Sequence, residues 1–205
     1  MAMTTTRRIL IEFAHPAMRR SRVNRRLIDA VRGLAGVTVN DLYETYPEFD
    51  IDVRREQSLL ESHDVVVLQH PFYWYSTPAI LKQWQDLVLE HGWAYGREGR
   101  ALRGKAVMSA ITAGGGEASY ARSGTHHFTI RELLAPIEQT AALCGMSFLP
   151  PFVVFGTHGL AASQIESIAQ EYRRTIESIR DGEIEPLPAK NPPRPVTDSG
   201  APQGG

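Results

Sequence analysis

The chain has 205 residues, of which 42% are hydrophobic and 22% charged, and this suits one globular domain with a large core. Its net charge of −1 at pH 7 gives no reason to expect a nucleic-acid partner. A single cysteine, Cys144, excludes an internal disulfide framework and fits a reducing compartment. Because Cys144 sits in a helical pattern before Gly145, we expect it to be a small core residue.

The N-terminal region is locally basic, with seven arginines between Arg7 and Arg26. A solvated basic face is the default interpretation, and contact with phosphate or an acidic partner is the alternative. No apolar run approaches the length of about 20 residues needed to cross a bilayer. The first residues also lack the apolar region of a signal peptide. We therefore expect a cytoplasmic protein, whose link to a membrane, if it has one, runs through a partner.

Runs of apolar and β-branched residues predict five strands, at 8–13, 37–42, 64–69, 105–113 and 148–155. Helical spacing of apolar residues predicts helices at 21–33, 54–62, 129–144 and 161–180. A further helix should start at Thr77-Pro78, a cap residue followed by a proline at the first helical position, and run toward Gly92.

Strands and helices thus alternate five times, which is typical of a doubly wound α/β domain with a parallel sheet. The near-continuous apolar run at 64–69 fits a strand covered on both faces. We predict one domain over residues 1–182 and a disordered or surface-lying tail over 183–205, because six of the thirteen prolines lie at or beyond Pro186.

A glycine-rich stretch follows the fourth predicted strand. It contains Gly114, Gly115 and Gly116, and then Tyr120 and His126. Three glycines help neither a strand nor a helix, but they let bare backbone N–H groups approach a flat or anionic ligand. Tyrosine and histidine can hold or transfer protons. The stretch therefore predicts a site, with a flexible glycine-rich loop as the alternative.

Two other loops with unusual content also follow strands of the predicted sheet. Residues 15–24, after the first strand, contain His15 and then Ser21 and Asn24 at a helix start, where free N–H groups and the helix dipole favour an anion. After the third strand come four consecutive aromatics, Phe72 to Tyr75, which could be a wall for a flat ring, a hydrophobic plug or a docking patch. With the strand order 2-1-3-4-5 these loops would meet in one crevice at the carboxyl ends of the strands.

The chain has neither GxGxxG nor GxxxxGK[ST] after its first strand, which argues against a dinucleotide-binding Rossmann site and a P-loop. A phosphate held by serine, asparagine and backbone groups fits a monoester better. A phosphate, a flat ring and a polar ring edge bound by amides together describe flavin mononucleotide, FMN.

Several motifs carry a resemblance to a known family over residues 9–177: IEFAHP, SRVN, VVVLQHPFYWYSTPAILKQWQD, HGWAYG, and TAGGGEASY with GTHH. The chain resembles the flavodoxin-like NAD(P)H:quinone oxidoreductases of the DT-diaphorase family. Within that family it is most similar to the ancillary proteins of glutathione-gated potassium efflux systems. The resemblance implies a flavodoxin-like fold with a five-stranded parallel sheet, FMN rather than FAD, and a homodimer with two sites at the subunit interface.

By that resemblance, the residues that would contact FMN are His15, Ser21, Arg22, Val23, Asn24, Phe72, Tyr73, Trp74, Tyr75, Thr112, Ala113, Gly114 and Gly115. Ala113 stands where a second threonine is common in the family. Tyr120 and His126 would occupy the positions that assist hydride transfer. NAD(P)H would deliver hydride to the flavin, and a quinone would then remove it.

Two functional classes remain open at this point: a quinone reductase, and a regulatory subunit that binds and activates a potassium/proton antiporter at the membrane. A one-electron flavodoxin carrier is a distant third class, because such a carrier would not need the Tyr120/His126 pair. A metal site is not expected at His126-His127, because no carboxylate or cysteine has ligand spacing. The sequence contains no GxSxG motif, which argues against a serine hydrolase.

Overall fold

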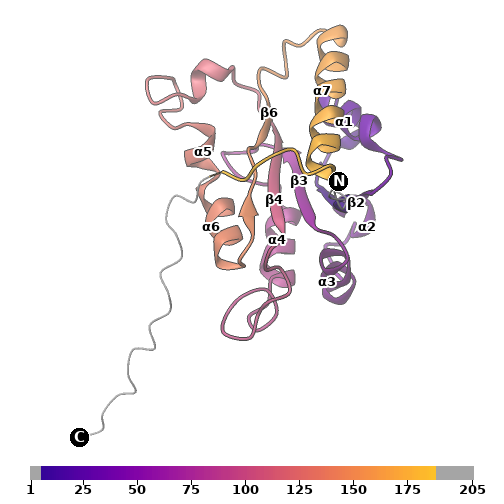
Figure 1. Cartoon of the computed structure of the whole chain (residues 1–205). Coiled ribbons are helices and arrows are strands. Elements are labelled where there is room, and N and C mark those ends of the chain that lie inside the picture. Colours follow the sequence, from indigo (N-terminus) through magenta and orange to yellow (C-terminus); the bar gives the residue numbers. More distant parts are fainter. Residues whose placement is uncertain (1–5, 188–205) are drawn as a thin grey trace, which may run out of the picture.

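A six-stranded parallel sheet organises the computed structural model, which describes residues 6–187 (Figure 1). Its strands are β1 (Ile9–Phe13), β2 (Val37–Asp41), β3 (Val65–Pro71), β4 (Ala106–Thr112), β5 (Ser147–Phe148) and β6 (Phe152–Val154). The order is β2-β1-β3-β4-β5, with β6 also paired to β4, and every pairing is parallel. Every residue of β1, β3 and β4 is buried, as their apolar sequences predict. The predicted flavodoxin-like architecture is confirmed.

The fifth predicted strand, 148–155, is divided in the structure. Both pieces pair with β4, since Phe148 lies opposite Val107 and Phe152 lies opposite Ala110. Pro150 and Pro151 separate them, and a proline has no N–H to donate to a strand ladder. The prediction of one continuous strand was therefore wrong in its interior.

Helices cover both faces of the sheet. They are α1 (Val23–Val31), α2 (Leu42–Thr45), α3 (Val53–Glu61), α4 (Ala79–Val88), α5 (Ile130–Leu133), α6 (Ala135–Leu143) and α7 (Ala162–Arg180), with 3-10 turns η1 (Met18–Arg20) and η2 (Glu117–Tyr120). Among residues 6–187, no helix combines the length and the apolar character needed to cross a bilayer.

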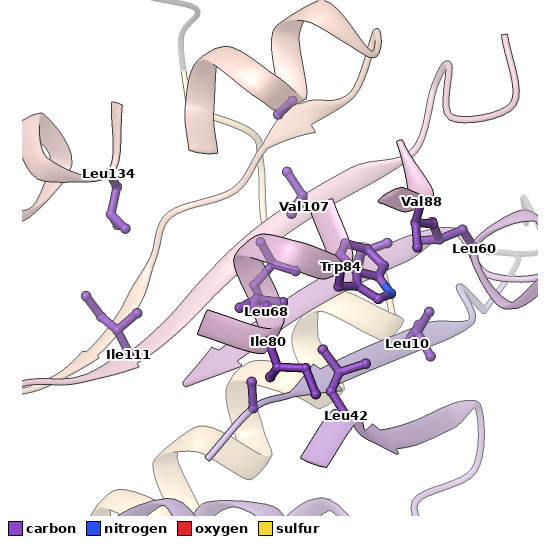
Figure 2. Close-up of a cluster of buried hydrophobic side chains, with 14 of the residues drawn as sticks. Leu10, Leu42, Leu60, Leu68, Ile80, Trp84, Val88, Val107, Ile111 and Leu134 are labelled. Carbon is purple, nitrogen blue, oxygen red and sulfur yellow. The ribbon is translucent and has the colours of Figure 1, made fainter. Parts of the chain in front are cut away.

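Alternate side chains along the strands pack into two hydrophobic cores, one on each face of the sheet. Ile9 and Ile11 of β1 pack on one face with α1 and α7, whereas Leu10 packs on the other face. Figure 2 shows that second core, in which Trp84 of α4 lies among strand and helix side chains. Cys144 is buried in the same core, which confirms its prediction as a small core residue.

Two predicted helices differ from the structure for local reasons. The helix predicted at 129–144 is interrupted at Leu134, because Pro136 in the next turn lacks an N–H and its ring crowds the preceding turn. Thr77 does not cap α4, since Pro78 itself occupies the N-cap position, and the helix ends at Val88 rather than near Gly92.

The strand predicted at 37–42 ends at Asp41, as β2. The Asp41 side chain accepts hydrogen bonds from the backbone N–H groups of Tyr43 and Glu44 and so starts α2, a helix that was not predicted from the sequence.

The domain boundary predicted at residue 182 stays a prediction. Within the described residues, Ile184 packs against one core and Leu187 against the other, and the Leu187 N–H donates to the Phe148 carbonyl at 2.8 Å. Most of the predicted tail lies outside the described residues.

Two buried carboxyl groups, Glu12 of β1 and Glu56 of α3, lie close together where β1, β2 and α3 meet. The Asn40 amide donates to Glu12 Oε2 at 2.8 Å and to Glu56 Oε2 at 2.9 Å. Glu56 also accepts from the Tyr46 hydroxyl at 2.6 Å and from the Trp84 indole at 2.9 Å. Burial, followed by the charge of Glu56, raises the pKa of Glu12 well above its usual range. Burial therefore favours the protonated form of Glu12 beside Glu56.

We expect Glu12→Gln to stabilise the protein increasingly as the pH rises. The folded state keeps the Glu12 proton above the pKa of the unfolded chain, so the stability due to that proton is lost as the pH rises toward the folded-state pKa. Each pKa unit of the shift corresponds to about 1.4 kcal/mol, and glutamine cannot ionise. Urea unfolding at pH 5, 7 and 9 checks this, with exposed Glu48→Gln as the control. A difference between Glu12→Gln and wild type that is the same at all three pH values would contradict it.

Candidate functional site

A cavity of about 820 Å³ lies at the carboxyl ends of β1, β3 and β4. It is lined by His15, Ala17, Arg20, Ser21, Arg22, Val23, Asn24, Pro71, Phe72, Tyr73, Trp74, Thr112, Gly114, Thr157 and His158. The three loops singled out in the sequence therefore meet here. A volume in this range is typical of small-molecule and cofactor sites, which span about 300–1,000 Å³.

Most of the predicted contact residues line this cavity, and a few lie beside it. The predicted residues outside the lining are Tyr75, Ala113, Gly115, Tyr120 and His126. Ala113 is fully buried, and its N–H donates to the Val154 carbonyl at 2.8 Å, so its backbone donor is already used.

One end of the cavity is built for an anion. Ser21, Arg22 and Val23 lie where α1 begins, no acidic residue occupies its first turn, and Arg20 adds positive charge at the rim. The first N–H groups of a helix have no intrahelical partner, and the helix dipole favours negative charge at this end.

A buried chain of hydrogen bonds fixes this helix start against the sheet. The Asn24 amide donates to Thr112 Oγ1 at 2.8 Å, and Gln69 of β3 donates to Asn24 Oδ1 at 3.4 Å. Tyr172 of α7 completes the chain by donating to Gln69 Oε1 at 2.8 Å. Burial raises the pKa of Tyr172, so its hydroxyl keeps the proton that it donates. The predicted contacts Asn24 and Thr112 thus also hold α1 and β4 together.

His15 borders the cavity after β1. Its Nδ1 accepts a hydrogen bond from the Ala17 N–H at 3.1 Å, which leaves Nε2 to carry the proton of the neutral ring. Partial burial lowers the pKa of His15, which favours that neutral form. His15 is therefore suited to donate a neutral hydrogen bond.

The four consecutive aromatic residues, Phe72 to Tyr75, form a tight turn and differ in how deeply they are buried. Ser76 donates to the Tyr73 carbonyl at 2.9 Å, and Trp74 and Tyr75 both have positive φ, 49° and 63°. Such left-handed backbone costs a residue other than glycine about 1 kcal/mol or more. Phe72 is buried in the core, whereas Trp74 is 92% exposed. Phe72 thus packs as a hydrophobic plug, while Tyr73 and Trp74 line the cavity, and their role as a ring wall stays a prediction.

The glycine-rich loop allows two histidines to approach its backbone. A Cβ atom at Gly115 would lie 2.9 Å from Nε2 of His126, and one at Gly114 would lie 2.9 Å from Nε2 of His158. Neither glycine has a positive φ. The requirement for glycine here therefore comes from close approach and not from backbone conformation.

The structure brings Tyr120 and His126 together beside Gly115. Their ring centroids are 4.4 Å apart, and the Tyr75 hydroxyl lies 3.2 Å from His126 Nδ1. Burial, with a smaller effect from Tyr75, raises the pKa of Tyr120. Tyr120 therefore stays a proton donor at neutral pH. Within residues 6–187, no three His, Cys, Asp or Glu side chains are grouped as metal ligands.

Five residues of the lining were not predicted from the sequence: Ala17, Arg20, Pro71, Thr157 and His158. Arg20 was part of the basic stretch noted in the sequence. Thr157 and His158 follow β6, so the rule that ligands bind at the carboxyl ends of parallel strands could have found them.

Comparison with known proteins gives relatives over most of the chain. A family profile described as a flavodoxin-like fold matches residues 7–178. The glutathione-regulated potassium-efflux system ancillary protein KefF of Enterobacter sp. (strain 638) is 44% identical over 168 residues, which cover 82% of this chain and 94% of that protein.

Two solved structures are similar in both sequence and fold. General stress protein 14 from Treponema denticola, in complex with FMN, is 39% identical with a TM-score of 0.81 and covers 84% of this chain and 99% of its own. An NADPH-quinone reductase from P. pentosaceus is 32% identical with a TM-score of 0.75 and covers 82% of this chain and 96% of its own.

Proposed function

The chain belongs to the flavodoxin-like family that contains NAD(P)H oxidoreductases and potassium-efflux ancillary proteins, and on that premise we propose that it is an FMN-dependent oxidoreductase. The substrates we propose are NAD(P)H as hydride donor and a quinone as acceptor. The observation that carries this proposal is the cavity at the strand ends, whose lining combines a helix start suited to an anion with Phe72, Tyr73, Trp74 and Gly114. The similar protein from T. denticola, whose structure contains FMN, supports it.

The residues of the cavity fit FMN part by part. The N-terminus of α1, with Ser21 and Arg22, would hold the phosphate, and the fixed position of Asn24 keeps that helix start against β4. Tyr73 and Trp74 would flank the flat ring. The amides of Gly114 and Gly115 are candidates to donate to its polar edge. FMN fits better than FAD, because this account requires a single phosphate.

Bound FMN would supply the chemistry, because it accepts a hydride from one substrate and gives it to the next. The protein's part is to orient the ring, exclude water and steady charge. The Gly114 and Gly115 amides would stabilise the negative charge that reduction places near their side of the ring, in the manner of an oxyanion hole. Tyr120 would hold a proton on its hydroxyl beside His126, so that the pair could deliver a proton at this edge.

Steady-state assays of the FMN-loaded protein test the enzymatic proposal. NADPH and NADH are each offered with a simple benzoquinone, a naphthoquinone and no acceptor. Quinone-dependent oxidation of the nicotinamide supports the proposal. If the loaded protein oxidises nicotinamide no faster with any quinone than without one, a quinone reductase is contradicted.

The same family resemblance leads us to propose a homodimer. Tyr73, Trp74, Tyr75 and Phe128 are large exposed side chains near or beside the site, and a second copy could cover them. Light scattering during size-exclusion chromatography gives the mass directly. A mass near 45.6 kDa, twice the 22.8 kDa of one chain, supports the dimer, and a mass of 22.8 kDa at high concentration contradicts it.

A second candidate function is supported by the 44% identity to KefF. We propose it as a regulatory role, in which the protein binds a potassium efflux antiporter at the inner face of the membrane and activates it. Co-purification with an antiporter from the same cells and potassium efflux with and without the protein test this role. Efflux that does not depend on the protein would contradict it, whatever the result with quinones.

A further inference from the structure

The loop between β6 and α7, residues 155–161, forms a further wall of the cavity. Its Gly156 N–H donates to the Gly115 carbonyl at 2.9 Å, and its Thr157 N–H donates to the Ala113 carbonyl at 3.2 Å. These two bonds fix the loop to the glycine-rich stretch on one side. The loop is therefore joined directly to the backbone that is expected to bind the ring edge.

Arg22 ties the same loop to the other side of the cavity. Its guanidinium donates to the Leu160 carbonyl at 2.8 Å, while Arg22 itself occupies the N-cap position of α1 and lines the cavity. The loop thus bridges from the glycine-rich stretch to the anion-binding helix. The Arg22 guanidinium therefore adds positive charge to the cavity and also holds the 155–161 loop in position.

The side chain of His158 is available to a ligand. It lines the cavity, it is exposed, and its Nε2 would lie 2.9 Å from a Cβ atom at Gly114. In the described part of the chain its ring makes no hydrogen bond. An imidazole with free nitrogens that faces a cavity can donate to or accept from whatever fills it.

We propose that His158 is a flavin-contacting residue, whose imidazole hydrogen-bonds the polar ring edge beside Gly114 and favours the reduced flavin over the oxidised one. Arg22 acts as its positioning residue through Leu160. This inference rests on the proposed binding of FMN. Reduction adds negative charge at the ring edge, and a donor fixed beside that charge stabilises the reduced form more than the oxidised form.

The test is the midpoint potential of FMN bound to the full chain, measured against a reference dye at constant pH. We expect His158→Leu to weaken binding of reduced FMN about tenfold relative to oxidised FMN, which lowers a two-electron midpoint by about 30 mV. His158→Gln keeps a side-chain donor and should restore most of the difference. His91→Leu, the same change at an exposed histidine outside the cavity lining, should leave the midpoint unchanged.

Arg22→Gln tests the positioning role. Loss of its charge should weaken FMN binding in both redox states alike, and that common effect does not move the midpoint. Loss of the bond to Leu160 should lower the midpoint in the wild-type background and have no further effect in His158→Leu. If Arg22→Gln lowers the midpoint potential equally in the wild type and in His158→Leu, Arg22 does not act through His158.

The outcomes separate this inference from the function on which it rests. A wild-type protein that does not bind FMN contradicts the proposed function. Normal FMN binding with an unchanged midpoint in His158→Leu overturns only the role of His158. Equal weakening of oxidised and reduced FMN also overturns it, because His158 would then contact a part of the cofactor whose charge does not change. Since His158 is exposed, its replacement removes no core packing, and unfolding in urea verifies this.

Discussion

Replacing Ser21 with aspartate should weaken FMN binding by about 100-fold or more, while the binding of riboflavin, which has no phosphate, stays nearly unchanged. Ser21 lines the cavity just before α1, where the free N–H groups of the helix start favour an anion. Two like charges about 4 Å apart repel by about 4 kcal/mol at an effective dielectric constant of 20. A loss of 100-fold needs only about 2.8 kcal/mol, so the repulsion suffices even after partial screening.

Fluorescence titration with FMN and with riboflavin measures both affinities. Ser21→Ala removes the hydroxyl without adding charge and should weaken FMN binding about tenfold or less. Ser58→Asp adds the same charge at an exposed position on α3 and should change neither affinity. If Ser21→Asp weakens FMN and riboflavin equally, the phosphate does not bind at α1.

Replacing either partner of the Tyr120/His126 pair should slow quinone reduction by about 100-fold without releasing the flavin. The two rings are 4.4 Å apart beside Gly115, outside the cavity lining, so Tyr120→Phe and His126→Gln remove proton-transfer groups and no wall of the cavity. General acid catalysis contributes about 10²–10⁴-fold, which sets the scale of the loss. Single-turnover reduction and reoxidation, followed by flavin absorbance, show which half-reaction is slowed.

The pH dependence gives a second check on Tyr120. Because burial raises its pKa above the usual value of about 10, the Tyr120-dependent part of the rate should persist through pH 9 and fall only at more alkaline pH. Tyr95→Phe and His91→Gln repeat the two chemical changes at residues outside the cavity lining and should leave the rate unchanged. An unchanged rate in both Tyr120→Phe and His126→Gln would remove the pair from the mechanism.

The fold could be predicted where one physical signal dominated. Strands β3 and β4 are buried on both faces, so their apolar runs are unambiguous, and α1 shows a clear apolar stripe. The signal failed where local chemistry competed with it. Pro136 and the Pro150-Pro151 pair divide segments whose hydrophobic pattern continues across them. Side-chain capping by Asp41 converted the end of a predicted strand into a helix.

The site could be predicted as a set of loops, but not in its detailed geometry. Trp74 and Tyr75 have left-handed backbone that glycine or asparagine would normally signal, so the turn was not visible in the sequence. The contact between Gly114 and His158 joins residues far apart in the chain, and only the pairing of β6 with β4 brings them together. Ala113 was placed among the cofactor contacts by resemblance. Nothing in the sequence around it indicates that its N–H donates a hydrogen bond to the Val154 carbonyl.

The most direct test of the account is the visible absorption spectrum of the purified full chain, with identification by mass of whatever heat releases from it. The account predicts a yellow protein that yields FMN at about one molecule per chain, or that takes up one when FMN is added. A colourless protein that also does not bind added FMN would contradict the account. The aromatic turn and the glycine-rich loop would then be a docking surface and not the walls of a flavin site.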